Sequence, residues 1–182
     1  MDQSAGIPAD QPIFYFDLGS PECYLAAEQV IGAPAVLGGR VPEFEPVLAA
    51  ELAADRGVGD GVDRDAIERR AASLGLQPLR WPAAWPPDTR RAMLAATYAK
   101  RIGRGVAFSL AAFRQAFAAG RDLGEDDTVL IAGAACEMHP SALLKGIGLR
   151  STEEALEEAT ERARRDGVLA LPALVGADGD VS

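Results

Sequence analysis

The chain has little of the chemistry that several functional classes require. Its 182 residues include only two cysteines and one histidine, and its 18 Lys and Arg residues are outnumbered by 27 Asp and Glu residues, for a formal net charge of -9. Proteins that hold nucleic acid or anionic membranes electrostatically need clustered positive charge. The sequence therefore predicts a small-molecule substrate or a protein partner, and neither nucleic acid nor a membrane.

Long apolar runs and targeting features are also missing. No stretch reaches the ~18 apolar residues of a membrane span, and the opening MDQSAGIPADQP has neither the basic region nor the apolar region of a signal peptide. We therefore expect a cytoplasmic protein. Because cytoplasmic thiols stay reduced, Cys23 and Cys136 are predicted to be free rather than joined in a disulfide.

The single histidine does not indicate a metal site. His139 follows Cys136 in the sequence CEMHPS, but these two residues lack the further ligands that zinc requires. We interpret His139 as a polar residue at a helix end and Cys136, in the apolar run IAGAAC, as part of the core. With 48% hydrophobic residues the chain can form a well-packed core.

The first fifty residues predict a β-α-β unit. Residues 13–17, IFYFD, are rich in strand-forming side chains. Ser20 is a suitable N-cap and Pro21 a suitable first residue for a helix over 22–31. Apolar and acidic residues alternate in a second strand within 41–47. Two strands joined in this way pair in parallel through a right-handed crossover.

A block of helical patterns follows, and the chain then returns to strand character at 173–175. Between the first two predicted helices lies RWPAAWPPDT, whose prolines forbid a continuous helix and whose Trp81 and Trp85 imply a rigid aromatic loop. These tryptophans either line a substrate cleft or fasten the loop to the helices. The predicted helices span residues 63–74, 89–102, 106–119, 126–136 and 152–165.

Ser20 and Cys23 stand three residues apart at the start of the first helix and allow three interpretations. Ser20 could cap the helix while Cys23 packs as a small apolar residue. Alternatively, the helix N-terminus could lower the pKa of a thiolate, either of Cys23 or of a bound thiol cofactor that accepts a hydrogen bond from Ser20. A two-cysteine redox site needs Cys-x-x-Cys and is excluded, because the first position here is serine.

The run FYFDLGSPECYLA resembles the first strand and active-site turn of the DsbA-like branch of the thioredoxin fold. It is most similar to the 2-hydroxychromene-2-carboxylate isomerase and kappa-class glutathione transferase members. Two later segments, RWPAAWPPDTRRAM and AFSLAAFRQAFAAGRDLGEDDTVLIAGAA, resemble their proline-rich segment and paired insertion helices, and RARRDGVLALPALV resembles the turn before their third strand. In the first motif Asp17, Ser20, Pro21, Tyr24 and Leu25 match the pattern, whereas Glu22 and Cys23 depart from it.

The resemblance implies an α/β thioredoxin-like fold, ordered β-α-β, helical insertion, β-β-α. Residues 1–62 and 151–182 would form the thioredoxin-like domain and 63–150 an all-helical insertion domain. The final strand and closing helix of the family have no counterpart before Ser182. In such a fold Pro172 would be a cis-proline, and the backbone of Leu171 would pair with the γ-glutamyl-cysteine part of glutathione.

The resemblance also implies a chemistry. Ser20 corresponds to the serine that hydrogen-bonds the thiolate of glutathione, and Pro21, Leu171 and Pro172 complete the site for this or another low-molecular-weight thiol. In the isomerases the thiolate adds reversibly to a conjugated double bond and so allows cis-trans isomerisation of a small aromatic or unsaturated acid. The relatives are often homodimers.

Two alternatives remain open at this stage. Cys23 occupies the place of the resolving cysteine of the disulfide oxidoreductases, so the chain could be a thiol-disulfide oxidoreductase or glutathione transferase that acts through Cys23. It could also be a non-enzymatic binding domain. Asp17 is expected to be a water-exposed carboxylate at the end of the first strand. Three arginines, at positions 80, 90 and 91, could attract a carboxylate-bearing substrate or simply be solvated.

Overall fold

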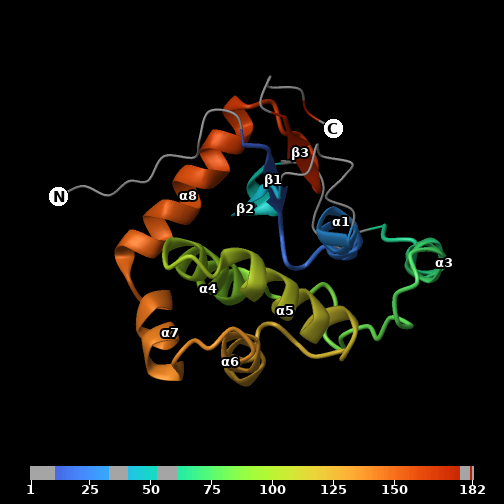
Figure 1. Cartoon of the computed structure of the whole chain (residues 1–182), viewed down its shortest axis with the longest axis horizontal. Coiled ribbons are helices and arrows are strands. Elements are labelled where there is room, and N and C mark those ends of the chain that lie inside the picture. Colours follow the sequence, from blue (N-terminus) through green and yellow to red (C-terminus); the bar gives the residue numbers. More distant parts are fainter. Residues whose placement is uncertain (1–10, 33–40, 53–60, 177–180, 182) are drawn as a thin grey trace.

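The computed structural model describes residues 11–32, 41–52, 61–176 and 181. Their order is strand, helix, strand, a series of helices and a third strand (Figure 1). The elements are β1 (Ile13–Phe16), α1 (Pro21–Gly32), β2 (Glu43–Pro46), α2 (Ala49–Leu52), α3 (Arg64–Ser73), α4 (Arg90–Arg101), α5 (Gly105–Phe117), α6 (Asp126–Ala134), α7 (Pro140–Ile147), α8 (Arg150–Arg165) and β3 (Ala173–Val175).

The described strands form one sheet in the order β2-β1-β3. β1 and β2 are parallel, with Ile13 opposite Glu43, which confirms the predicted β-α-β unit. β3 runs antiparallel to β1, with Tyr15 opposite Ala173. Val181 forms a single antiparallel bridge with Val175, and most of the turn predicted between them lies outside the described residues.

Side chains of β1 alternate between two apolar clusters because successive residues of a strand point to opposite faces. Phe14 and Phe16 lie in the larger cluster, where the Phe16 ring is 5.7 Å from that of Phe113 of α5. Tyr15 lies in the smaller cluster, which includes Ala159 and Ala163 of α8. Figure 1 accordingly shows α8 on one side of the sheet and α1 on the other. Each buried phenylalanine contributes about 1.5–3 kcal/mol.

A buried carboxylate fastens two helices to β2. The side chain of Glu45 is 4% exposed, and it accepts hydrogen bonds from Lys100 of α4, at 2.5 Å, and from Arg162 of α8. On the same side of the sheet the Tyr15 hydroxyl donates to Asp166 at 2.7 Å. Glu45, which follows Phe44 in β2, therefore pairs with two cations, because a buried charge is costly unless it is paired.

The helical part departs from prediction in its last third. α6 ends at Ala134 rather than Cys136, and α7 was not predicted, nor was the short α2. His139 is the N-cap of α7, where its Nδ1 accepts from the Ser141 N–H at 3.3 Å, so it begins a new helix instead of ending the preceding one. Glu137, with φ of 59°, makes the reversal between α6 and α7.

Cys23 and Cys136 are both free, as predicted, and Cys136 belongs to the larger apolar cluster, as expected of a core residue. Cys23 is buried as well, which agrees with the first of the three interpretations of this residue. The helices between residues 63 and 150 are described, but the division into two domains at these boundaries stays a prediction. Within the described ranges there is no helix of the length and apolarity needed to cross a bilayer, and no group of three or more potential metal ligands.

Candidate functional site

The predicted thiol site lies at the turn between β1 and α1. The Ser20 N–H donates to the Asp17 carbonyl at 3.1 Å, and the chain then enters α1 at Pro21. The Ser20 hydroxyl oxygen accepts from the Cys23 N–H at 3.1 Å and the hydroxyl donates to the Glu22 carboxylate, also at 3.1 Å. Ser20 is therefore the N-cap of α1, with 9% of its surface exposed.

Cys23 is enclosed in this arrangement. Its side chain has no exposed surface, and burial raises the pKa of its thiol to about 12, although the hydrogen bond with Ser20 acts in the opposite direction. A helix N-terminus lowers a thiol pKa, but here desolvation outweighs that effect. In this conformation Cys23 is a protonated core thiol, so nucleophilic chemistry at its sulfur would require the turn to open.

Asp17 is buried, not exposed as expected, with 3% of its surface accessible. Its carboxylate accepts from the Gly19 N–H at 2.9 Å, the Ala49 N–H at 3.1 Å and the Thr89 hydroxyl at 3.2 Å. These donors replace water, which explains how a strand-end carboxylate can be enclosed, while burial still raises its pKa. Asp17 thus ties the Ser20 turn to the segment after β2 and to the start of α4. The sequence signal was the Asp-x-Gly spacing, which favours a side-chain turn of this kind.

Leu171 and Pro172 lie beside the same turn. The peptide bond between them is cis, as the resemblance predicted. In the antiparallel register Ala173 is opposite Tyr15, so the two preceding residues fall next to the carboxyl end of β1, where the turn begins. Both are half-buried. The fold therefore brings Ser20, Pro21, Leu171 and Pro172 to one end of the sheet, although their binding roles stay predictions.

Trp81 and Trp85 belong to a row of aromatic rings that reaches α1. Their rings are 5.1 Å apart and edge-on, and the Phe117 ring lies 6.2 Å from Trp81 and 6.4 Å from Trp85. Phe117 in turn stacks on Tyr24, 5.6 Å away, one helical turn after Ser20. The tryptophans therefore fasten their loop to the helices, as one interpretation holds. Their contact with substrate stays a prediction.

The arginines singled out in the sequence, at positions 80, 90 and 91, are all exposed, which agrees with the expectation that they are solvated. Arg90 pairs with Glu153 at 2.5 Å and Arg91 pairs with Asp126, with all four side chains about half exposed. These two are solvated ion pairs. The cation that lies on the tryptophan rings is instead Arg64. No sequence signal joins it to the aromatic loop, because the approach is made by folding.

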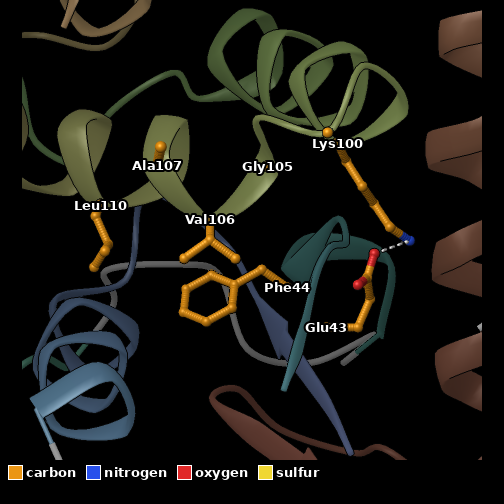
Figure 2. Close-up of a pocket in the computed structure, with 8 residues that line it drawn as sticks. Glu43, Phe44, Lys100, Gly105, Val106, Ala107 and Leu110 are labelled. Carbon is orange, nitrogen blue, oxygen red and sulfur yellow. Dashed lines mark ion pairs between the residues drawn. The ribbon is translucent and has the colours of Figure 1, made fainter. Parts of the chain in front are cut away.

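A cavity of about 480 Å³ lies elsewhere, between β2 and the α4–α5 connection (Figure 2). Its walls include Phe44, Val106 and Leu110, and the Lys100 ammonium pairs with Glu43 at 3.6 Å on one side. Glu43 is opposite Ile13, at the amino end of β1, whereas Ser20 follows the carboxyl end. This cavity is therefore separate from the thiol site.

The arrangement defines a class of fold. A parallel β-α-β unit, a helical block and an antiparallel strand preceded by a cis-proline make a thioredoxin-like fold with a helical insertion, the DsbA-like architecture. No family model matches the chain, and no curated protein matches it in sequence.

Solved structures nevertheless resemble it over nearly its whole length. A 2-hydroxychromene-2-carboxylate isomerase aligns with a TM-score of 0.78 at 21% identity, covering 94% of this chain and 87% of that one. A probable DsbA oxidoreductase from Streptomyces coelicolor gives 0.76 at 16%, covering 95% and 82%. The cytosolic disulfide reductase DsbM from Pseudomonas aeruginosa gives 0.70 at 17%, covering 94% and 87%, and is also known with GSH bound. At these identities the likeness establishes the fold.

Proposed function

We propose that the chain is a thiol-dependent enzyme that holds glutathione, or another low-molecular-weight thiol, at Ser20 and uses it to isomerise a small aromatic or unsaturated acid. The observation that carries this proposal is the capping geometry of Ser20 at the start of α1, with the cis Leu171–Pro172 bond beside it. The burial of Cys23 adds weight, because it keeps the sulfur of that residue away from a ligand at the turn, where Ser20 supplies a hydroxyl group.

The physical basis is stabilisation of a thiolate. The first turn of α1 supplies partial positive charge, which favours an anion placed before it. The Ser20 hydroxyl proton, which points to Glu22 in the free site, would turn to the sulfur of the bound thiol. Both interactions favour the ionised thiol and so lower its pKa toward neutrality.

The reaction is balanced without an oxidant. The thiolate sulfur forms a bond to the β-carbon of a double bond conjugated to a carbonyl group, and the π electrons move to the carbonyl oxygen. Rotation then takes place about the resulting carbon–carbon single bond. The electrons return, the double bond forms again, the carbon–sulfur bond breaks and the thiolate is regenerated. Trp81 and Trp85 are assigned to the substrate in this scheme, and the backbone of Leu171 with Pro172 to the thiol.

A second candidate is thiol-disulfide exchange or glutathione transfer through Cys23. It is favoured by the position of Cys23, whose N–H bonds the Ser20 hydroxyl oxygen, and by the disulfide reductase among the similar structures. It requires exposure of a sulfur that is enclosed in this conformation.

A binding domain without catalysis is the third candidate. For any of the three we propose a cytoplasmic location, a small-molecule ligand and a homodimer, and no role for nucleic acid or membranes.

The test is thermal unfolding of the purified protein with increasing reduced glutathione, with S-methylglutathione as the control. A ligand at about 100 times its Kd adds ~2.7 kcal/mol and should raise Tm by about 5–10 °C. Ser20→Asp keeps a good helix cap but removes the hydroxyl donor and places a negative charge where the thiolate would lie. We expect this variant to fold and to lose the shift. An equal shift with the S-methyl compound, or in Ser20→Asp, would contradict the proposal.

A further inference from the structure

Arg64 is held on the aromatic loop in a way that leaves its charge available. Its guanidinium carbon lies 4.7 Å from the centre of the Trp81 ring and 5.5 Å from that of Trp85. Arg64 is exposed and both tryptophans are half-buried. The Trp81 indole N–H donates to Glu68 at 2.7 Å, which fixes the orientation of that ring. The cation therefore rests on a defined aromatic surface at the edge of the protein.

Some arginines of the protein are engaged by carboxylates, and Arg64 differs from these. Arg91 pairs with Asp126, and Arg114 pairs with Glu28 at 2.7 Å. Over the ranges that the structure describes, Arg64 makes no ion pair. The carboxylate one turn after it, Glu68, is instead engaged by the Trp81 indole.

The charge around Arg64 does not oppose an anion. The preceding Asp63 uses its carboxylate to cap α3, accepting from the Ala66 N–H at 3.0 Å. Within residues 63–70 three acidic side chains are balanced by three arginines. The local segment is thus neutral as a whole, and a ligand anion that reaches Arg64 meets no net repulsion from it.

Stacking prepares a guanidinium to bind a carboxylate. Arg is planar, and when its face lies on an aromatic ring the N–H groups at its edge stay free to donate. A carboxylate then accepts two parallel hydrogen bonds, an arrangement stronger than a contact between two neutral groups. The two indole rings also restrict the long side chain, so less conformational freedom is lost when the ligand binds.

We propose that Arg64, Trp81 and Trp85 form a subsite for the carboxylate end of an aromatic or unsaturated acid. The aromatic row through Phe117 to Tyr24 connects this subsite to the first turn of α1, which follows Ser20. The inference rests on the proposed function for its substrate class and gives that function a specificity residue. Arg64 selects the acid, and Ser20 serves the thiol.

The chain provides its own probe, because its only two tryptophans are those of the subsite. Tryptophan emission, excited at 295 nm, is recorded as trans-cinnamate is added, and cinnamamide serves as the uncharged control. We expect saturable quenching by cinnamate and a Kd at least tenfold weaker for cinnamamide. Arg64→Gln should weaken cinnamate binding at least tenfold. Arg64→Lys should restore part of it, since Lys supplies the charge without the planar pair of donors.

Arg69→Gln is the matched control, because this arginine is also exposed, lies on α3 and makes the same change in net charge. Its cinnamate affinity should equal that of the unaltered protein. The inference is overturned if cinnamate gives no saturable quenching, if the amide binds as well, or if the two substitutions have equal effects. Arg64-dependent cinnamate binding without a glutathione shift would support the subsite and refute glutathione as the thiol at Ser20, so the two failures are distinguishable.

Discussion

Cys23 offers the sharpest test of the site, because the structure predicts that its thiol is inert under conditions where a catalytic cysteine would be reactive. The thiolate is the species that is alkylated, and a free cysteine has a pKa near 8.5. Burial raises the pKa of Cys23 to about 12. At pH 7.5 this difference lowers the thiolate fraction about 3 × 10³-fold. Steric enclosure slows alkylation further, since no part of the residue is exposed.

The assay is labelling of the native protein with iodoacetamide, followed by peptide mapping to separate Cys23 from Cys136. Between pH 7 and 9.5 the rate at Cys23 should increase about tenfold for each pH unit without reaching a plateau, because the whole range lies below its pKa. In urea the rate should rise to that of a free thiol.

The raised pKa of Cys23 also affects the free energy of unfolding. The part of that free energy linked to this thiol is fully present below about pH 8.5 and is lost as pH rises toward 12.

Rapid labelling at pH 7.5, or a plateau with a midpoint below about pH 8.5, would refute the reasoning. That result would mean that the turn opens readily or that the helix N-terminus governs the thiol. It would transfer support from the glutathione-dependent isomerase to the oxidoreductase or transferase that acts through Cys23.

Two further predictions concern the polar groups that hold the site in place. Asp17→Ala leaves the buried donors around that carboxylate without an acceptor and should lower the free energy of unfolding by about 2–4 kcal/mol, measured by urea titration, with a weaker glutathione shift; unchanged stability would contradict the bonding described. Glu45→Gln should lower the free energy of unfolding by about 2–4 kcal/mol, because Lys100 and Arg162 lose the carboxylate that they share. Both cations are partly exposed, so water compensates part of the loss. Glu154→Gln, in a largely exposed pair with Arg150, is the control and should cost under ~0.5 kcal/mol; equal losses would refute the contrast.

The local parts of the fold could be predicted from the sequence because their signals are local. The strand at 13–16 follows from its aromatic residues, and Ser20 with Pro21 marks the start of α1. The reversal at Glu137 could not be predicted, because its left-handed backbone conformation is adopted by a residue with no preference for it. The sequence therefore predicted one helix that extends to Cys136 and did not indicate that a second helix, α7, begins at Pro140.

The site was predictable in its chain positions but not in its environment. Ser20 and the cis-proline came from the motif and the resemblance, and the register of β3 places them at one end of the sheet. Burial of Asp17 depends on donors from Ala49 and Thr89, which lie 32 and 72 residues further along the chain. The contact of Arg64 with the tryptophans is likewise a product of tertiary packing. The local Asp-x-Gly spacing indicates only the bond from Gly19, and these long-range contacts have no signal in the sequence.

The shared carboxylate of Glu45 limits how the molecule can move. It binds Lys100 of α4, in the helical insertion, and Arg162 of α8, while its own backbone is paired within the sheet. A hinged opening of the insertion away from the sheet would strand a buried negative charge, which is costly. The insertion therefore behaves as a fixed wall rather than a lid. If the proposed function holds, the thiol and the acid would reach Ser20 through rearrangement of side chains and loops, while the frame around them stays rigid.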